Sequence, residues 1–218
     1  MDSAAATQAA RNMMVDSQVR PNKVTDGRIV AAMRALPRER FLPPALAPLA
    51  YADEDVPLGG GRYLLEPMVI ARLAQLAAAG AGARALVVAA GTGYGAALLA
   101  ACGADVTALE ADASLRVLAR AALPPEVAVV AGEPGDGWPA DAPYDIVLIE
   151  GAVEDLPEAL AGQVKRDGGR LVMVRAGAGP VGQAVLGTWG GDGFVFRPEF
   201  DCATPALPAL RRKPRFVF

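Results

Sequence analysis

The segment from Ala85 to Asp112 constrains the fold more than any other part of the chain. It reads ALVVAAGTGYGAALLAACGADVTALEAD: an apolar run, a turn with three glycines, a second apolar run, and a short apolar segment that ends in acidic residues. This order is typical of a strand, a tight turn, a helix and a second strand. Strands joined through a helix run parallel, so the segment predicts a βαβ unit.

The chain after this unit continues the alternation of strand and helix patterns. Strand patterns occupy residues 126–133, 144–152 and 168–176, and helical patterns occupy residues 67–79, 114–123, 156–164 and 180–189. Two short aromatic segments, 193–203 and 214–218, follow without an intervening helix and read as strands. We therefore predict an α/β fold with a doubly wound, mostly parallel sheet and an antiparallel C-terminal strand.

The first 66 residues are different in kind. Residues 9–36 predict two short helices that are broken at Pro21, and residues 36–67 are rich in Pro and Gly, which predicts a long ordered loop or a lid. We expect one domain over residues 1–218, with a helical and loop extension at 1–66 and a Rossmann-like core at 67–218.

Composition excludes several classes of function. The net charge is −3 and the pI about 5.1, which argues against nucleic-acid binding, and the basic cluster at residues 211–215 reads as a solvated tail. The chain has no histidine, and Cys102 and Cys202 read as free, buried thiols, so we expect no metal site. Residues 85–104 carry no charge, but their glycines favour a buried strand, turn and helix over a membrane span. Without a secretory signal either, the chain is expected to be cytoplasmic, with no membrane partner.

The glycine turn matches a known ligand-binding pattern. Residues 91–96 (GTGYGA) satisfy GxGxx[G/A], and Glu110 follows 19 positions after Gly91, which suits an acid that binds ribose hydroxyls. The pattern by itself allows a nicotinamide cofactor and S-adenosylmethionine equally. A structural alternative is that the glycines only close a tight turn, while Glu110 caps a helix or faces water.

The residues available for proton transfer favour methyl transfer over hydride transfer. Hydride transfer usually needs His, or Tyr with Lys four residues later, and none of the four tyrosines has such a lysine (Tyr51, Tyr63, Tyr94 and Tyr144). An ionised carboxylate accepts a methyl group without a general base, so positioning alone suffices for that reaction.

Four segments together resemble the protein-L-isoaspartate O-methyltransferase family. They are MVDSQVRPNKVTDGRIVAAMRALPRERFLP, AYADEDVPLGGGRYLLEP, AAGTGYGAALLA and APYDIVLIEGAVEDLP, and the resemblance runs from about Arg11 to Val174. It implies a class I methyltransferase sheet with a helical N-terminal extension and S-adenosyl-L-methionine as the methyl donor. The implied acceptors are isoaspartyl carboxylates in damaged proteins, whose methylation begins repair.

The resemblance also implies roles for particular positions. Gly91, Thr92 and Gly93 would contact the methionine part and the ribose of the cofactor, Glu110 would bind the ribose hydroxyls, and Glu133 would lie near the adenine. The substrate loop would contain Leu65, Glu66 and Pro67. No residue is assigned as catalytic.

At several of these positions the chain departs from the family's pattern. Leu65 stands where the family has a serine at the methyl-transfer site, and Tyr63 stands at a threonine. Val87 replaces an acid that helps to hold the charged end of the cofactor, with Ala89 and Ala90 before Gly91, and Glu150 replaces a small neutral residue.

Three hypotheses follow. The first is that the chain is an isoaspartyl methyltransferase. The second is a catalytically altered or silent member of the same fold, which binds the cofactor or a protein. The third is a nicotinamide-dependent oxidoreductase.

Overall fold

Seven strands form one sheet in the computed structural model, which describes residues 3–191 and 193–212. Their order is β5-β4-β3-β6-β7-β8-β9, with β8 and β9 antiparallel and the others parallel. The strands are β3 Arg84–Val88, β4 Asp105–Glu110, β5 Ala128–Ala131, β6 Ile146–Val153, β7 Arg170–Arg175, β8 Gly182–Gly190 and β9 Gly193–Cys202. The chain runs outward from β3 to β5 and then returns to β6 on the other side of β3. Ligands of open α/β sheets bind where the order reverses in this way, at the carboxyl ends of the strands.

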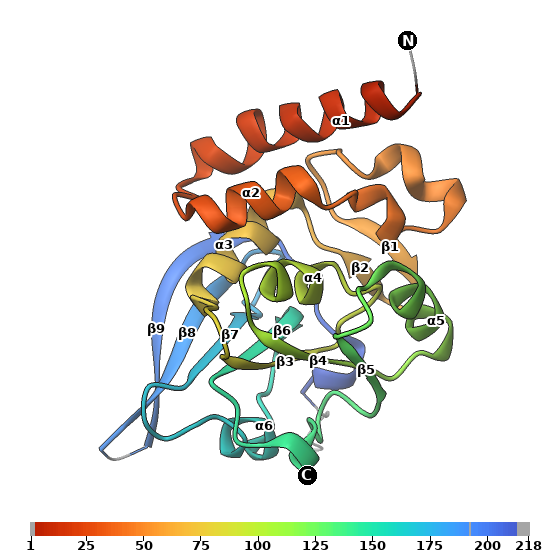
Figure 1. The fold of residues 1–218 in the computed structure, drawn as a ribbon. Coiled ribbons are helices and arrows are strands. Elements are labelled where there is room, and N and C mark those ends of the chain that lie inside the picture. The colour runs from red at the N-terminus through yellow and green to blue at the C-terminus, as the bar shows by residue number, and fades with distance from the viewer. Residues whose placement is uncertain (1–2, 192, 213–218) are drawn as a thin grey trace.

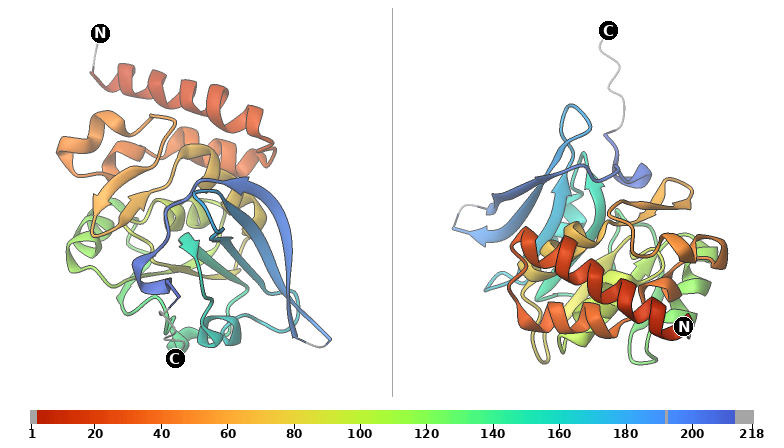
Figure 2. Two further views of the ribbon diagram at one scale, coloured as in Figure 1. Left: turned by 180° about the vertical axis from the view of Figure 1, so that it is seen from behind. Right: turned by 90° about the horizontal axis from the view of Figure 1, so that it is seen from above.

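Helices lie on both faces of the sheet, as the alternation predicts. They are α1 Ser3–Met14, α2 Gly27–Ala35, α3 Pro67–Ala77, α4 Tyr94–Ala101, α5 Ala113–Ala122 and α6 Glu158–Gly162. The N-terminal helices α1 and α2 lie over α3 and α4 on one side, and α6 lies at the opposite side (Figures 1 and 2). Neighbouring residues of β6 enter different hydrophobic clusters. Leu148 enters the cluster on the side of α1 to α4, and Ile149 enters the cluster on the side of α6. Burial on both faces explains why the strand sequences are continuously apolar.

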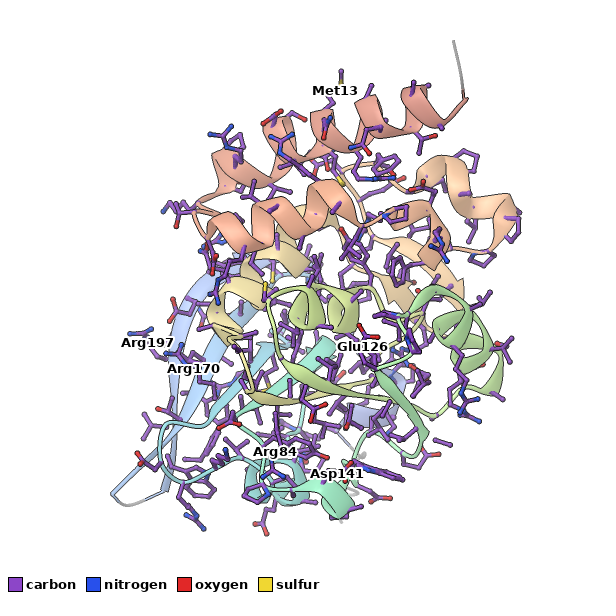
Figure 3. All side chains as sticks on the ribbon, in the orientation of Figure 1. Met13, Arg84, Glu126, Asp141, Arg170 and Arg197 are labelled. Carbon is purple, nitrogen blue, oxygen red and sulfur yellow. The ribbon has the colours of Figure 1, made fainter. Side chains whose placement is uncertain are left out.

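The N-terminal extension is broken where the sequence predicts it. Helix α1 continues as a π-helical turn over Val15–Val19, and the chain reverses after Pro21. Asp26 then caps α2 by accepting a hydrogen bond from the backbone N–H of Arg28 at 2.9 Å. Met13 points away from the body of the protein on the outer side of α1 (Figure 3), and 69% of its surface is exposed.

The Pro- and Gly-rich segment holds more regular structure than we expected. It contains two 3₁₀ turns, Arg38–Phe41 and Pro44–Leu49, and then a β-hairpin of β1 Val56–Gly59 and β2 Arg62–Leu64. The turn of this hairpin consists of residues 59–61, three glycines with φ of 94°, 58° and 73°. Because glycine adopts positive φ without steric cost, three in succession allow a segment otherwise broken by prolines to close as a hairpin.

The expectation of a helix at residues 180–189 was wrong, because this segment forms β8. Ala184 and Leu186 enter the cluster on the side of α1 to α4, whereas Val185 enters the cluster on the side of α6, so successive side chains face opposite sides of the sheet. A short apolar run shows no such alternation in sequence when both faces are covered, and it then cannot be distinguished from a buried helix. The sheet therefore ends in two antiparallel strands rather than one. The strand expected at 193–203 is present as β9, and the strand expected at 214–218 lies outside the described residues.

Both cysteines are free and buried, as predicted.

At the amino ends of the strands, Arg84 donates to the carbonyls of Asp141 and Pro143 (Figure 3). Within the described residues no helix is long and apolar enough to cross a membrane.

Replacing Ala78 by glycine should stabilise the protein. Ala78 ends α3 in the left-handed conformation (φ 51°, ψ 44°), and its side chain is exposed. Glycine adopts this conformation without the steric cost of a Cβ, so we expect a gain of about 1 kcal/mol in the free energy of unfolding, measured by urea denaturation. Ala121→Gly, at an exposed position inside α5, is the control and should lower the free energy of unfolding by a similar amount. If Ala78→Gly were as destabilising as Ala121→Gly, Ala78 would not be strained.

Candidate functional site

The glycine loop between β3 and α4 has the backbone geometry that only glycine adopts easily. Gly91 and Gly93 have φ of 57° and 94°, and the N–H of Gly93 donates to the carbonyl of Ala90 at 2.8 Å. A Cβ on Gly93 would lie 2.6 Å from a methyl of Leu123, so packing also requires glycine there. Ala89, just before the loop, has φ 56° although it carries a Cβ, so it is a strained position.

Glu110 ends β4 and joins the glycine loop directly. Its side chain is 1% exposed, Oε2 accepts a hydrogen bond from the N–H of Gly91 at 2.7 Å, and Oε1 accepts one from the N–H of Asp112 at 3.0 Å. Helix α5 is capped by Asp112, which accepts from the N–H groups of Ser114 and Leu115. The alternative in which Glu110 caps a helix or faces water is therefore wrong.

The hairpin β1–β2 brings Arg62 onto the same carboxylate. Arg62 Nη1 donates to both oxygens of Glu110, at 2.9 and 2.8 Å, and Nη2 donates to the carbonyl of Ala89. A Cβ placed on Gly91 would lie 3.5 Å from Leu58 and 3.9 Å from Arg62, so these two side chains cover the loop. The sequence analysis missed Arg62, because its partner lies 48 positions away in sequence. The only local signal was a charged residue directly after the glycine turn.

Beside this ion pair lies a pocket of about 160 Å³. Arg62, Glu110, Asp112 and Glu133 contribute its polar lining, and residues 207–209 close its other side. The structure thus brings Glu133, whose side chain is exposed, to the same pocket as Glu110.

Glu150 is buried near the carboxyl end of β6 instead of pointing to solvent. It is 5% exposed, and burial raises its pKa to about 8; the nearby Glu110 also raises this pKa, whereas Arg62 and Arg38 lower it. A Cβ on Gly95 would lie 2.3 Å from Glu150 Oε1, so the carboxyl group lies against the first turn of α4. Val87, on the neighbouring strand, is fully buried in the core.

Arg38 binds the backbone of the loop that contains Leu65. This fully buried side chain donates from Nε to the carbonyl of Ala50 at 2.8 Å and from Nη2 to the carbonyl of Leu65 at 2.5 Å, and its guanidinium lies 4.7 Å from the centre of the Tyr94 ring. Burial lowers the pKa of Arg38. Leu65 itself is 2% exposed and packs in the core.

Of the two residues after Leu65, Glu66 is partly exposed and Pro67 is buried. The N–H of Glu66 donates to Asp55 Oδ1 at 2.8 Å, and burial raises the pKa of both carboxyls. Pro67 begins α3.

Several buried polar atoms around the glycine loop have no hydrogen-bond partner among the described residues. Thr92 is 1% exposed, and its Oγ1 is one of them. The Oη of Tyr94, two positions along the chain, is another, and so are Arg38 Nη1, Arg62 Nε and Glu150 Oε1. Native proteins rarely leave such groups unpaired, so this cluster indicates a place for water or for a ligand. By contrast, the described residues contain no group of three His, Cys, Asp or Glu that could hold a metal ion.

The sheet order, the glycine loop and the acid at the end of β4 define a class I S-adenosylmethionine-dependent methyltransferase fold. A solved structure of a protein-L-isoaspartate O-methyltransferase has this fold: it superposes with a TM-score of 0.75 at 22% identity, over 92% of this chain and 65% of that one. The chain thus spans about two thirds of the length of that solved protein.

Sequence comparison identifies the family. Residues 9–184 match the family model of protein-L-isoaspartate(D-aspartate) O-methyltransferases. The protein-L-isoaspartate O-methyltransferase of Methylorubrum extorquens (strain PA1) is 40% identical over 180 residues, which are 81% of this chain and 78% of the relative. That of Gloeobacter violaceus (strain ATCC 29082 / PCC 7421) is 34% identical over 206 residues, 93% and 99% of the two chains. The chain belongs to the protein-L-isoaspartate O-methyltransferase family, whose members use S-adenosylmethionine.

The site fits S-adenosylmethionine in chemical type but is closed by the hairpin. A glycine loop, a buried acid and an adjoining pocket suit an adenosine group. A carboxylate, however, has about four lone-pair sites, and Arg62, Gly91 and Asp112 already use those of Glu110. Ribose hydroxyls can therefore bind Glu110 only after Arg62 has left it.

Proposed function

We propose that this protein is a carboxyl methyltransferase that acts on L-isoaspartyl residues of damaged proteins in the cytoplasm. The observation that carries the proposal is the carboxylate of Glu110, held against the glycine loop by the N–H of Gly91 within a chain of this family. When bound, S-adenosylmethionine supplies a methyl group that an ionised carboxylate takes up without proton transfer. The protein's own part is then to position the two reactants and to exclude water.

Each residue of the site has a place in this proposal. Gly91, Thr92 and Gly93 receive the methionine part and the ribose, Glu110 binds the ribose hydroxyls, and Glu133 lies on the adenine side of the pocket. The segment Leu65–Pro67, anchored through the carbonyl of Leu65 by Arg38, presents the acceptor. With a leucine at the family's serine position, backbone groups would have to bind the incoming carboxylate.

A second candidate is a member that binds the cofactor or a protein without catalysis. Two observations favour it: Leu65 offers no polar group, and Arg62 occupies the carboxylate that the ribose needs. The methyltransferase and a member that binds the cofactor both predict binding of S-adenosylhomocysteine, a member that binds only a protein does not, and only the methyltransferase predicts methyl transfer.

Methyl transfer to an isoaspartyl peptide is the test. The wild-type protein should transfer a tritiated methyl group to an isoaspartyl peptide and at least about 100-fold more slowly to its aspartyl twin, because transition-state positioning distinguishes the two carboxylates. Glu110→Gln removes the charge that accepts the ribose hydrogen bonds and should weaken S-adenosylhomocysteine binding about 10-fold or more in calorimetry. Binding without transfer to either peptide would select the second candidate. Binding of NAD alone would exclude both.

A further inference from the structure

Glu150 of β6 and Val87 of β3 lie on neighbouring strands and face the same side of the sheet. In the register of β3 and β6, Val87 lies opposite Leu148 and Val88 opposite Ile149. The carboxyl group of Glu150 lies against Gly95 of α4, on the face of the sheet where Val87 and Leu148 pack in the same cluster as α4. Glu150 follows the last residue of β6 that pairs with β3, at the point where the strand order reverses.

The local structure is shaped around this carboxyl group. The pairing of β6 with β7 shifts its register between Leu148 and Ala152, which is a bulge, and bulges next to ligand sites re-aim side chains. Helix α4 has Gly95 in its first turn, where any Cβ would collide with Glu150 Oε1. That oxygen has no hydrogen-bond partner among the described residues.

A positively charged side chain, that of Arg62, already lies near Ala89 and Glu150. Arg62 donates from Nη2 to the carbonyl of Ala89, which directly follows the last paired residue of β3. The charged groups that act on Glu150 are Arg62, Glu110 and Arg38, together with the backbone of Gly95. Once Arg62 leaves Glu110 for a ligand, the Ala89 carbonyl loses this donor and Glu150 loses a nearby positive charge.

We propose that Glu150, with the carbonyl of Ala89, binds the α-ammonium at the amino-acid end of S-adenosylmethionine, in place of the acid that the family's pattern has at the position of Val87. A carboxyl group would then act from β6, the strand beside Val87, on the same face of the sheet. This inference rests on the proposed function, because it concerns the ligand of that site.

The test compares ligands with and without the ammonium group. Calorimetry on wild-type protein and on Glu150→Gln would use S-adenosylhomocysteine, S-adenosylmethionine and 5′-methylthioadenosine, which lacks the amino-acid end. Glu150→Gln removes a hydrogen bond between the carboxylate and the ammonium group, which only the first two ligands carry. We therefore expect the variant to bind these two about 10- to 100-fold more weakly, and to bind 5′-methylthioadenosine with an affinity within about twofold of the wild type. Wild-type binding of S-adenosylhomocysteine at pH 7 should also release a proton that the variant does not release, because the pKa of free Glu150 is about 8.

The outcomes separate this inference from the proposed function. Equal losses for all three ligands, or no loss for any, would overturn the assignment of Glu150 while leaving methyl transfer intact. A loss confined to S-adenosylmethionine would place the carboxyl group at the sulfonium and also overturn it, and so would the same proton release in both proteins. Failure of wild-type protein to bind any of the three would instead remove the proposed function itself.

Discussion

Replacing Arg62 by methionine should tighten the binding of S-adenosylhomocysteine about 10- to 100-fold, because the ligand then no longer displaces a hydrogen-bonded charge pair. In the free protein Arg62 Nη1 holds both oxygens of Glu110, at 2.9 and 2.8 Å, and Nη2 holds the carbonyl of Ala89. Methionine fills a similar volume without donors. Glu110 would keep its bonds from the N–H groups of Gly91 and Asp112 and so stay in place.

Arg116→Met is the matched control for Arg62→Met. Arg116 lies beside the same residue, but its Nη1 donates to the backbone carbonyls of Glu110 and Ala111, at 2.8 and 2.5 Å, and not to the carboxylate. The control makes the same change of charge and should leave the affinity within about twofold, because Arg116 makes no bond to the carboxylate that the ligand would use. Unchanged or weaker binding in Arg62→Met, with the fold verified by circular dichroism, would show that Arg62 assists the ligand rather than competing with it.

The parts of the fold that follow from local sequence were predictable. The βαβ unit at 85–112 and the parallel strands β3 to β7 each carry a pattern that is complete within one window of residues. The segment at 180–189 does not: its residues show no period of two in polarity, and only its pairing with β7 and β9 makes it a strand. The hairpin at 56–64 was hidden for a related reason, because its proline and its three glycines signal irregular backbone until a tight turn is considered.

The site was predictable only where it is local in sequence. The glycine loop and Glu110 follow from spacing, and the structure joins them through one hydrogen bond. Arg62 and Arg38 were missed, because each acts on backbone or side-chain groups far away in sequence, and no periodicity reports such a pairing. The ligand roles of the loop, of Glu133 and of the segment after Leu64, and the division of the chain at residue 67, stay predictions.

Glu150→Gln should stabilise the protein at neutral and alkaline pH, and by an amount that depends on pH. Burial raises the pKa of Glu150 from its ordinary value of 4.5 to about 8, so the folded state binds a proton that the unfolded chain has already lost over this range. The contribution of the protonated carboxyl to stability is fully present below pH 4.5 and is lost as the pH rises to about 8. The slope is a little over 1 kcal/mol per pH unit, so the loss by pH 7.5 is about 4 kcal/mol. Glutamine has the same shape and no titration, and it escapes this loss.

Urea denaturation at several values between pH 5 and pH 8.5 measures the effect as the difference in unfolding free energy between Glu150→Gln and wild type. That difference should grow with pH up to about 8 and then level off, because above the folded-state pKa both states of the wild type are ionised. Ala78→Gly involves no ionisable group, so its curve should run parallel to that of the wild type. A flat difference for Glu150→Gln would mean that the carboxyl is already paired in the free protein. The other outcome is that the difference in unfolding free energy depends on pH and that saturating S-adenosylhomocysteine stabilises the wild type more than the variant. The same buried charge then both destabilises the free protein and binds the ligand.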